Sequence, residues 1–508
     1  MFVPSYNVYR MNAVHYISPS QELQPQQAWQ LVLTKSYIAL SDEAIQRIEK
    51  CRRYLNEAIP RSKKPIYGIN TGFGSLCDQA IDAQDLETLQ YNLLRSHACG
   101  MGNVVHQDIV RLMLLLKVQG LSYGHSGVQL STVQSLIDLF NMQITPVVYS
   151  RGSLGASGDL APLANLCLPI IGEGEVWYNG ERMSTADAAE WTGFRPVRLA
   201  SKEGLALING TQFMSAHLVY TVCMGKKLFD QALSVAAIGM EAFDARIEPF
   251  WPHTHRVRPH DGQQYVAERM SQLLSGSPIR EMEKPRVQDP YSFRCMPQVL
   301  GASYGALRHA EEVCTTEINA VTDNPIIFPD EDLIISGGNF HGEPLAQVLD
   351  YLAIALSEIG SISERRVYKF MAGTSWYPAY LANDAGLNSG FMIAQYAAAA
   401  IASANKQLCT PSSVDSIDSS NGQEDHVSMG ANGAVKCVEV LDNVIRIVAI
   451  EWCTAAQALE FRRPLTSSKA VEEMFVELRA VVPFMDVDRD LGKDLRAAEE
   501  MLRNKIVQ

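Results

Sequence analysis

The chain has 508 residues, of which 47% are hydrophobic and 19% are charged. This composition is typical of a folded protein with a large buried core and unlike that of a disordered chain. The formal net charge of −13 argues against nucleic acid or an acidic membrane surface as the partner, because binding to either needs a basic excess. A small molecule is the expected partner.

The N-terminus and the cysteines favour a cytoplasmic protein. The first residues lack the basic flank and apolar core of a secretory signal. The most alanine-rich stretch, 389–404, is interrupted by Gln395, and no apolar run is expected to span a bilayer. The ten cysteines stand singly between Cys51 and Cys453, so we expect reduced core thiols rather than disulfides or zinc ligands.

Helices are predicted along most of the chain. Apolar residues recur at i, i+3, i+4 and i+7 in the segments 106–121 and 129–143, which is typical of amphipathic helices. Longer apolar-rich stretches follow with no proline in their interiors, and they predict a bundle of long, largely buried helices. These stretches are 210–245, 298–321, 345–372, 389–408 and 432–461.

The evidence for strands is limited to one hairpin. The segments Glu175–Tyr178 and Glu181–Met183 flank the dipeptide Asn179-Gly180, which favours a two-residue hairpin turn. One small hairpin does not change the fold class, which is predicted to be mainly α.

One domain boundary is predicted near residues 204–205, where loop-rich sequence gives way to long helices. It divides the chain into an N-terminal domain of residues 1–204 and a long-helix bundle domain of residues 205–508. No internal repeat or low-complexity linker suggests a further division.

The histidines at positions 253, 255 and 260 superficially resemble a metal cluster. Pro252 and Pro259 are expected to place them in a loop without regular ligand geometry. We therefore predict no metal site there.

Several common catalytic templates are missing from the sequence. The segments "GFGSLC" at 72–77 and "GEGEVW" at 172–177 lack the third glycine of the dinucleotide fingerprint. Neither a Walker lysine motif nor a G-x-S-x-G elbow occurs. The chemistry is therefore expected to need no external cofactor.

The unusual segment is "RGSLGASGDLAPLANL" at 151–166, where glycines surround Ser153 and Ser157. By itself it suggests a tight turn that feeds a helix, with Asp159 or Ser157 as the cap. A strained, glycine-dense turn also lets the nitrogen of Gly158 approach and attack the carbonyl carbon of Ala156. Loss of water from that adduct and from Ser157 leaves a conjugated ring with an electrophilic methylene.

This segment resembles the active-site loop of the ammonia-lyases and aminomutases that carry the 4-methylidene-imidazol-5-one group (MIO). The resemblance runs from about Tyr67 to about Leu465, and seven further blocks match in the same order. These blocks are "YGINTGFGSL" at 67–76, "LLRSHACGMG" at 93–102, "GLALINGTQ" at 204–212, "VQDPYSFRC" at 287–295, "AVTDNPIIF" at 320–328, "SGGNFHGEP" at 336–344 and "GQEDHVSMG" at 422–430.

The resemblance implies that Ala156, Ser157 and Gly158 form MIO autocatalytically, so that an amino acid's amine becomes a better leaving group. Tyr67 matches the family's catalytic base, and its alternative is a half-buried core tyrosine. Arg294 matches the carboxylate anchor, and its alternative is a surface salt bridge. The residues that match positions around the substrate and the electrophile are Asn209, Gln288, Tyr291 and, as an aromatic wall, Phe340.

The substrate is expected to be decided at the side-chain end of the site. His97, preceded by Ser96, and Glu424 match positions that face an imidazole in histidine lyases, where phenylalanine lyases carry an apolar residue and a glutamine. Some tyrosine lyases share the Ser-His pair, so Glu424 is the better discriminator. Two departures from the histidine enzymes are "NGQ" at 421–423 and Asn165, which stands where a histidine often occurs.

The resemblance implies an ammonia-lyase and fumarase type of helical bundle in a homotetramer, with each site lined by three chains. The predicted reaction converts histidine to urocanate and ammonia, as in histidine catabolism. The alternatives are a tyrosine or phenylalanine ammonia-lyase, an aminomutase that returns ammonia to the β-carbon, and a catalytically silent helical scaffold.

Overall fold

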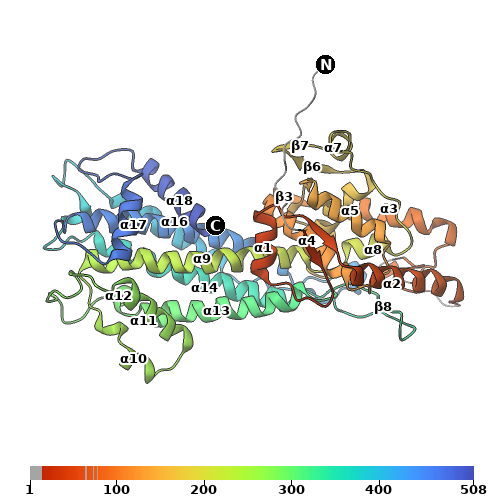
Figure 1. The fold of residues 1–508 in the computed structure, drawn as a ribbon, viewed down its shortest axis with the longest axis horizontal. Helices are drawn as coiled ribbons and strands as arrows, with labels where there is room; N and C mark the ends of the chain where they lie inside the picture. Colours follow the sequence, from red (N-terminus) through yellow and green to blue (C-terminus); the bar gives the residue numbers. More distant parts are fainter. Residues whose placement is uncertain (1–13, 63–65, 73, 77, 508) are drawn as a thin grey trace, which may run out of the picture. The chain divides into compact units, whose positions relative to one another are not determined.

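The computed structural model describes residues 14–62, 66–72, 74–76 and 78–507, and most of these are helical (Figure 1). They form two compact units, each assembled from three segments of the chain. The first unit comprises 1–220, 311–347 and 411–435, and the second comprises 221–310, 348–410 and 436–508. The predicted mainly α fold is confirmed.

The first unit combines short helices with four small sheets. Its helices are α1 (Pro25–Leu33), α2 (Asp42–Arg61), α3 (Leu86–His97), α4 (Gln107–Ser122), α5 (Leu130–Asn141), α6 (Leu160–Cys167), α7 (Thr185–Thr192) and α8 (Glu203–Ile208). Its strands are β1 (His15–Ile17), β2 (Ile38–Leu40), β3 (Met101–Val104), β4 (Thr145–Pro146), β5 (Tyr149–Arg151), β6 (Glu175–Tyr178), β7 (Glu181–Ser184), β8 (Ile326–Phe328) and β9 (Leu333–Ile335). β1 pairs with β2 in parallel, whereas β3–β5, β4–β6–β7 and β8–β9 are antiparallel.

Long helices dominate the second unit, and four of them begin or end in the first. These four are α9 (Gln212–Phe243), α13 (Met296–Ile318), α14 (Glu343–Phe370) and α16 (Gly430–Glu460). The others are α10 (Pro252–Arg256), α11 (Asp261–Leu273), α12 (Tyr291–Arg294), α15 (Met392–Leu408), α17 (Lys469–Arg479) and α18 (Leu491–Val507). Short 3-10 turns are η1 (Gly74–Leu76), η2 (Ala83–Asp85), η3 (Leu168–Ile171), η4 (Glu248–Phe250), η5 (Ala379–Leu381) and η6 (Ser420–Gly422).

The second unit packs its long helices at glycines. In Figure 1 the α9, α13 and α14 segments of this unit run side by side. A Cβ at Gly225 of α9 would meet Leu307 of α13 at 3.1 Å and Leu356 of α14 at 3.4 Å. The lack of a side chain therefore lets three helices approach closely, and residues 221–245 are buried except for a stripe at 226, 227, 230, 231 and 234.

Most of the predicted elements are confirmed. The two amphipathic segments form α4 and α5, and the long stretches form α9, α13, α14, α15 and α16. The hairpin is β6–β7, and its turn residues Asn179 and Gly180 both have positive φ, at 50° and 83°. The units differ from the predicted cut at 204–205: four of their five boundaries fall within the long helices α9, α13, α14 and α16, and the fifth, at 410–411, follows α15.

Two predictions about local features are wrong in part. His253 and His255 lie in the five-residue helix α10, begun by Pro252, rather than in a loop, and only His260 lies outside it. The described residues contain no group of three or more His, Cys, Asp or Glu that could hold a metal ion. Nine cysteines in this part of the chain are free, but Cys99 is exposed and is not a core thiol. Cys77 lies outside the described residues.

α14 also departs from the expectation that no apolar run could span a bilayer. An 18-residue window of this helix has a mean hydropathy of 1.4. Of that window, 67% is buried inside the structure, as in a core helix of a helical bundle.

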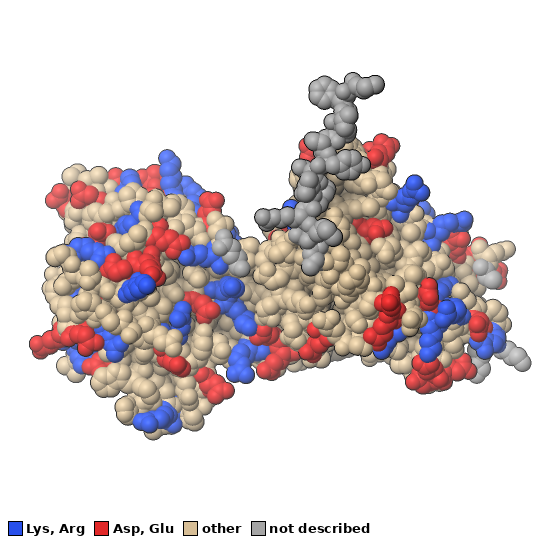
Figure 2. Space-filling view, in the orientation of Figure 1, with Lys and Arg blue, Asp and Glu red and all other residues tan. Residues whose placement is uncertain are grey.

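On the face drawn in Figure 2, acidic and basic side chains are interspersed over the surface of both units.

Candidate active site

The predicted electrophile segment is a loop between strand β5 and helix α6 of the first unit. Gly152, Gly155 and Gly158 all have positive φ, at 141°, 64° and 73°. Ala156 is buried and Ser157 is partly exposed, so the triad lies at a surface of the unit with one side chain accessible. The loop is therefore held in a conformation that L side chains rarely adopt.

Glycine at position 158 is required by a neighbouring segment. Gly158 forms a parallel bridge with Gly210, and a Cβ at Gly158 would lie 2.2 Å from the Gly210 oxygen. The Asp159 N–H donates to that oxygen at 2.8 Å, so the Gly158 nitrogen is not engaged in this bond. Position 158 therefore has no room for a side chain and its nitrogen stays out of this bond, so the residues of the loop fit the group that the resemblance implies.

Asp159 stands at the N-terminus of α6, but its carboxylate does not cap that helix. It accepts instead from Ser153 Oγ at 3.0 Å and from the Met214 N–H at 3.0 Å, in the first turn of α9. Complete burial raises the pKa of Asp159 to about 7, and these hydrogen bonds oppose the rise. The carboxylate therefore ties the loop to the start of α9, where N–H groups need acceptors.

Asn209 lies directly behind Ser157. It follows the last residue of α8, and its Nδ2 donates to Ser157 Oγ at 3.0 Å. Its side-chain oxygen is buried and has no partner among the described residues. The structure thus confirms that Asn209 lies beside the triad, although the role assigned to it remains a prediction.

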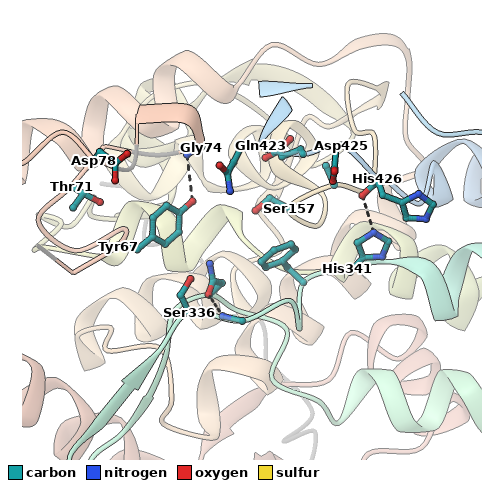
Figure 3. Close-up of a pocket in the computed structure, with 15 residues that line it drawn as sticks. Tyr67, Thr71, Gly74, Asp78, Ser157, Ser336, His341, Gln423, Asp425 and His426 are labelled. Carbon is teal, nitrogen blue, oxygen red and sulfur yellow. Dashed lines mark hydrogen bonds between the residues drawn. The ribbon is translucent and has the colours of Figure 1, made fainter. Parts of the chain in front are cut away.

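A cavity of about 650 Å³ opens over the triad. Ala156, Ser157, Tyr67, Phe340 and Glu424 are among the residues that line it, so five predicted site residues meet here. Figure 3 shows the Tyr67 ring and the Ser157 hydroxyl directed into this space, with a hydrogen bond from the Gly74 N–H to Tyr67 Oη at 3.4 Å. The hydroxyl of Tyr67 and that of Ser157 therefore face the same cavity.

A second cavity of about 500 Å³ shares Tyr67, Ser157 and Glu424 with the first and adds His97. His97 is the last residue of α3, and its Nδ1 lies 2.9 Å from the Leu93 carbonyl, which can only accept. The neutral ring therefore carries its proton on Nδ1 and keeps Nε2 as an acceptor. Burial lowers the pKa of His97, against the opposing effects of the Leu93 bond and the Glu424 charge.

Glu424 is held next to His97 by its own loop. Its Oε2 accepts from Ser419 Oγ at 2.9 Å, and its backbone pairs with Ser419 in an isolated bridge. The carboxylate is partly exposed and lines both cavities. One acceptor nitrogen and one carboxylate therefore lie together at the end of the site that was predicted to read the substrate ring.

Gln288, Tyr291 and Arg294 belong to the second unit and line neither cavity. They form a cluster of their own. Arg294 stacks on the Tyr291 ring at 4.5 Å and donates through Nε to the Asp289 carbonyl at 2.8 Å. With the Gln288 amide oxygen turned toward the guanidinium, that oxygen accepts from both terminal nitrogens at 3.2 and 2.9 Å. The cluster thus belongs to the second unit, whereas the Ala-Ser-Gly triad belongs to the first.

Sequence reasoning missed several residues that shape the site. Ser428 Oγ donates to the Gly155 oxygen at 3.0 Å and would lie 2.1 Å from a Cβ at Gly155. Asp425 and His426 line the larger cavity, and His341 Nε2 donates to the His426 carbonyl at 3.1 Å. These residues are part of the matched blocks, but a matched block of sequence does not show where a side chain points. Of the two departures, Asn421 and Gly422 lie in η6, directly before Gln423, which lines the cavity, and Asn165 is buried in α6.

The mainly helical fold, with a glycine-locked Ala-Ser-Gly loop beside a polar cavity, defines a class of lyases. The chain belongs to the aromatic amino acid lyase family, whose model matches residues 23–480. Histidine ammonia-lyase from Symbiobacterium thermophilum is 47% identical over 469 residues, which cover 92% of each chain.

Solved structures agree with this assignment. Histidine ammonia-lyase from Trypanosoma cruzi is 40% identical, has a TM-score of 0.90 and covers 97% of this chain and 94% of its own. Phenylalanine aminomutase from Pantoea agglomerans is 30% identical, with a TM-score of 0.92 over 97% of this chain and 100% of its own. The likeness confirms the predicted family and the fold class.

Proposed function

We propose that this protein is a histidine ammonia-lyase that eliminates ammonia from L-histidine to give urocanate. The observation that carries the proposal is the pairing of His97 and Glu424 in a cavity shared with Ser157 and Tyr67. Relatives named histidine ammonia-lyase at 43–47% identity support the same substrate.

Recognition of the imidazole follows from hydrogen-bond chemistry. The neutral imidazole of histidine has one N–H donor and one acceptor nitrogen, and the two exchange with tautomer. His97 Nε2 and the Glu424 carboxylate both accept, so a ring that donates from either nitrogen finds a partner. A phenyl ring would leave these polar groups unpaired, and such sites discriminate by about 10⁴-fold or more.

Tyr67 is the proposed base. When formed from Ala156, Ser157 and Gly158, the MIO group supplies an electrophile that makes the substrate amine a better leaving group. The β-proton then passes to Tyr67 Oη, the C–N bond breaks, and a double bond forms between Cα and Cβ. Before that group forms, Asn209 holds the Ser157 hydroxyl through its 3.0 Å contact, while Phe340 closes one wall of the cavity.

Arg294 is the proposed carboxylate anchor, supplied by a second copy of the chain in a homotetramer. Its cluster with Gln288 and Tyr291 lies on the second unit, and Tyr291 is 70% exposed, so it is available to another molecule. Exposed apolar residues on α14 and α15, including Tyr351, Ile354 and Tyr396, support assembly. The acidic composition and the free thiols support a cytoplasmic location.

Subunit complementation tests the shared site. Ser157→Ala and Arg294→Ala are each expected to be nearly inactive. When the two variants are co-expressed, or mixed after dissociation, some sites combine the intact Ser157 of one chain with the intact Arg294 of another. Tetramers that contain such sites should regain activity. An Arg294→Ala and Gln288→Ala mixture is the control that should stay inactive, because both changes affect the same cluster. Failure of the first mixture to regain activity would show that each chain builds its own site.

The reaction itself is tested by product analysis. Purified protein is incubated separately with histidine, tyrosine and phenylalanine, and the products are identified by mass and near-ultraviolet absorbance. We expect urocanate from histidine and little product from the others. A β-amino acid would instead indicate an aminomutase, which the structural likeness to phenylalanine aminomutase makes the second candidate.

A further inference from the structure

Lys117 is a charged residue in the middle of an apolar helix. It lies in α4 between the buried residues Leu116 and Val118, and only 2% of it is exposed. Its Nζ donates to the main-chain oxygen of Asn209 at 2.7 Å. The buried carboxylate of Asp323 attracts Lys117 but forms its ion pair with Lys202, at 2.6 Å. The strongest contact that the structure gives Lys117 is therefore to a neutral carbonyl.

A charged lysine in this environment destabilises the folded state. Burial lowers the pKa of Lys117 to about 8, and the charge of Asp323 opposes the shift. A buried ammonium without a carboxylate partner destabilises a fold, whereas an apolar residue of similar length would suit the interior of α4. Its presence points to the group that it binds rather than to helix stability.

The Asn209 carbonyl lies at the junction between α8 and the electrophile loop. On one side, Asn209 Nδ2 donates to Ser157 Oγ at 3.0 Å. On the other, Gly210 has φ of 122° and accepts from the Asp159 N–H at 2.8 Å, opposite Gly158. Glycine has little intrinsic preference for one conformation, so this backbone needs an external contact to stay in place.

We propose that Lys117 is a positioning residue that holds the Asn209 carbonyl, and thereby keeps Asn209 on Ser157 and Gly210 against Gly158. This inference rests on the proposed function, because it assigns Lys117 to the formation and use of the same electrophile. Lys117 touches neither the triad nor the cavities over it. It acts on them through Asn209.

Two substitutions at Lys117 and one matched control test the proposal. Lys117→Met keeps an unbranched apolar chain that is one atom shorter than lysine and removes the donor. Lys117→Gln keeps a donor that is one bond shorter and reaches the carbonyl less well. Gln119→Met is the control, because Gln119 is also buried in α4 and bonds Tyr123 rather than Asn209.

Three measurements are made on each purified full-length protein. Intact mass gives the fraction of chains that lack two waters. Thermal unfolding shows whether each variant is folded, and steady-state assays give kcat and KM for histidine. We expect Lys117→Met to form the electrophile slowly or incompletely. Its kcat per formed electrophile should fall about 10²-fold with KM changed far less, since small displacements of catalytic groups have effects of this size. Lys117→Gln should be intermediate and Gln119→Met close to wild type.

The outcomes separate the alternatives. Wild-type mass loss and kcat in Lys117→Met would overturn the proposal, as would equal losses in Lys117→Met and Gln119→Met. If Lys117→Met does not fold, Lys117→Gln decides, and an unchanged kcat per electrophile in that variant overturns the proposal. If the wild-type protein shows no mass loss and no turnover of histidine, the proposed function fails first, and the inference about Lys117 fails with it.

Discussion

Two buried arrangements of charged and polar residues serve different ends in this protein. Around the electrophile loop, Lys117 binds a carbonyl, Asp159 binds a hydroxyl and an N–H, and Asn209 keeps one oxygen without a partner. Between α14 and α16 in the second unit, Glu451 accepts from Arg366 through both nitrogens of a fork and from Ser363 Oγ at 2.6 Å.

The difference lies in how completely each set is paired. The Arg366–Glu451 pair is a bidentate ion pair that satisfies both carboxylate oxygens and joins two helices. Around the loop, burial pushes the pKa of Asp159 up to about 7 and that of Lys117 down to about 8, because neither is neutralised by a partner of opposite charge in direct contact. The Arg366–Glu451 arrangement stabilises the fold. The buried groups around the loop, in our proposal, hold its backbone in place.

The largest expected effect comes from the loop. Ser157→Ala removes the hydroxyl that is lost as the second water, so kcat should fall by about 10³-fold or more. The free energy of unfolding should change by less than about 1 kcal/mol, because Ser157 is partly exposed and its hydroxyl has one partner in the structure, Asn209. Intact mass, turnover and thermal unfolding are compared with those of Ser150→Ala, a change in the adjacent strand β5. Undiminished turnover in Ser157→Ala would remove the triad from the chemistry.

Between α14 and α16 we expect the opposite: a large loss of stability with little change in kcat. Arg366→Met leaves Glu451 buried without its cation and should destabilise the protein by about 3–5 kcal/mol, with kcat per folded molecule nearly unchanged. The matched control is Arg308→Met, because Arg308 is 51% and its partner Asp261 85% exposed, so that their pair is worth less than about 1 kcal/mol. Thermal unfolding of both variants checks this, and equal midpoints for the two would contradict the assigned difference between the arrangements.

A smaller and more selective effect is expected at the substrate end of the site. Glu424→Gln keeps the size of the side chain but removes the charge beside His97, so kcat/KM for histidine should fall by about 10–100-fold. Any activity on tyrosine should fall less, because a phenol ring has no nitrogen that needs a carboxylate partner. Steady-state assays on both amino acids test this. An equal loss on both would assign Glu424 to the chemistry rather than to recognition of the ring.

The sequence predicted elements more fully than contacts. Hydrophobic spacing located α4, α5 and the long helices, because a helix buried on one or more faces must repeat apolar residues along itself. The glycines at 155 and 158 marked the loop, but nothing local shows that Gly158 lies against Gly210, since that approach depends on tertiary packing. Lys117 had a visible signal, a single charge within "LMLLLKVQGL", yet its partner is 92 residues away.

The surroundings of Tyr67 and Arg294 could not be read from spacing either. Both residues match motifs, but motif order carries no distance. Only the structure shows that Tyr67 lines the cavity of the first unit and that Arg294 binds Gln288 and Asp289 in the second.

The smallest predicted effect concerns pH and sharpens the comparison at His217, in the part of α9 that belongs to the first unit. Its Nδ1 donates to the Phe213 carbonyl at 2.7 Å, and complete burial lowers the pKa of this ring to about 4. The unfolded chain, with an ordinary histidine pKa near 6.5, binds a proton that the folded chain refuses between about pH 4 and pH 6.5. The free energy of unfolding should therefore fall as pH is lowered through that window, by at most roughly 1.4 kcal/mol per pH unit from this one residue.

His217→Gln replaces the ring with an amide that can still donate to the carbonyl but does not titrate. The difference in unfolding midpoint between wild type and this variant should be constant above about pH 7 and should shift in favour of the variant as the pH falls toward 4. His253→Gln, at an exposed position of α10, controls for the loss of an imidazole. If the difference between wild type and His217→Gln is the same at pH 5 and pH 8, then burial does not hold His217 in its neutral form, and the contrast between a neutral buried group and the paired charges of Arg366 and Glu451 is lost at this residue.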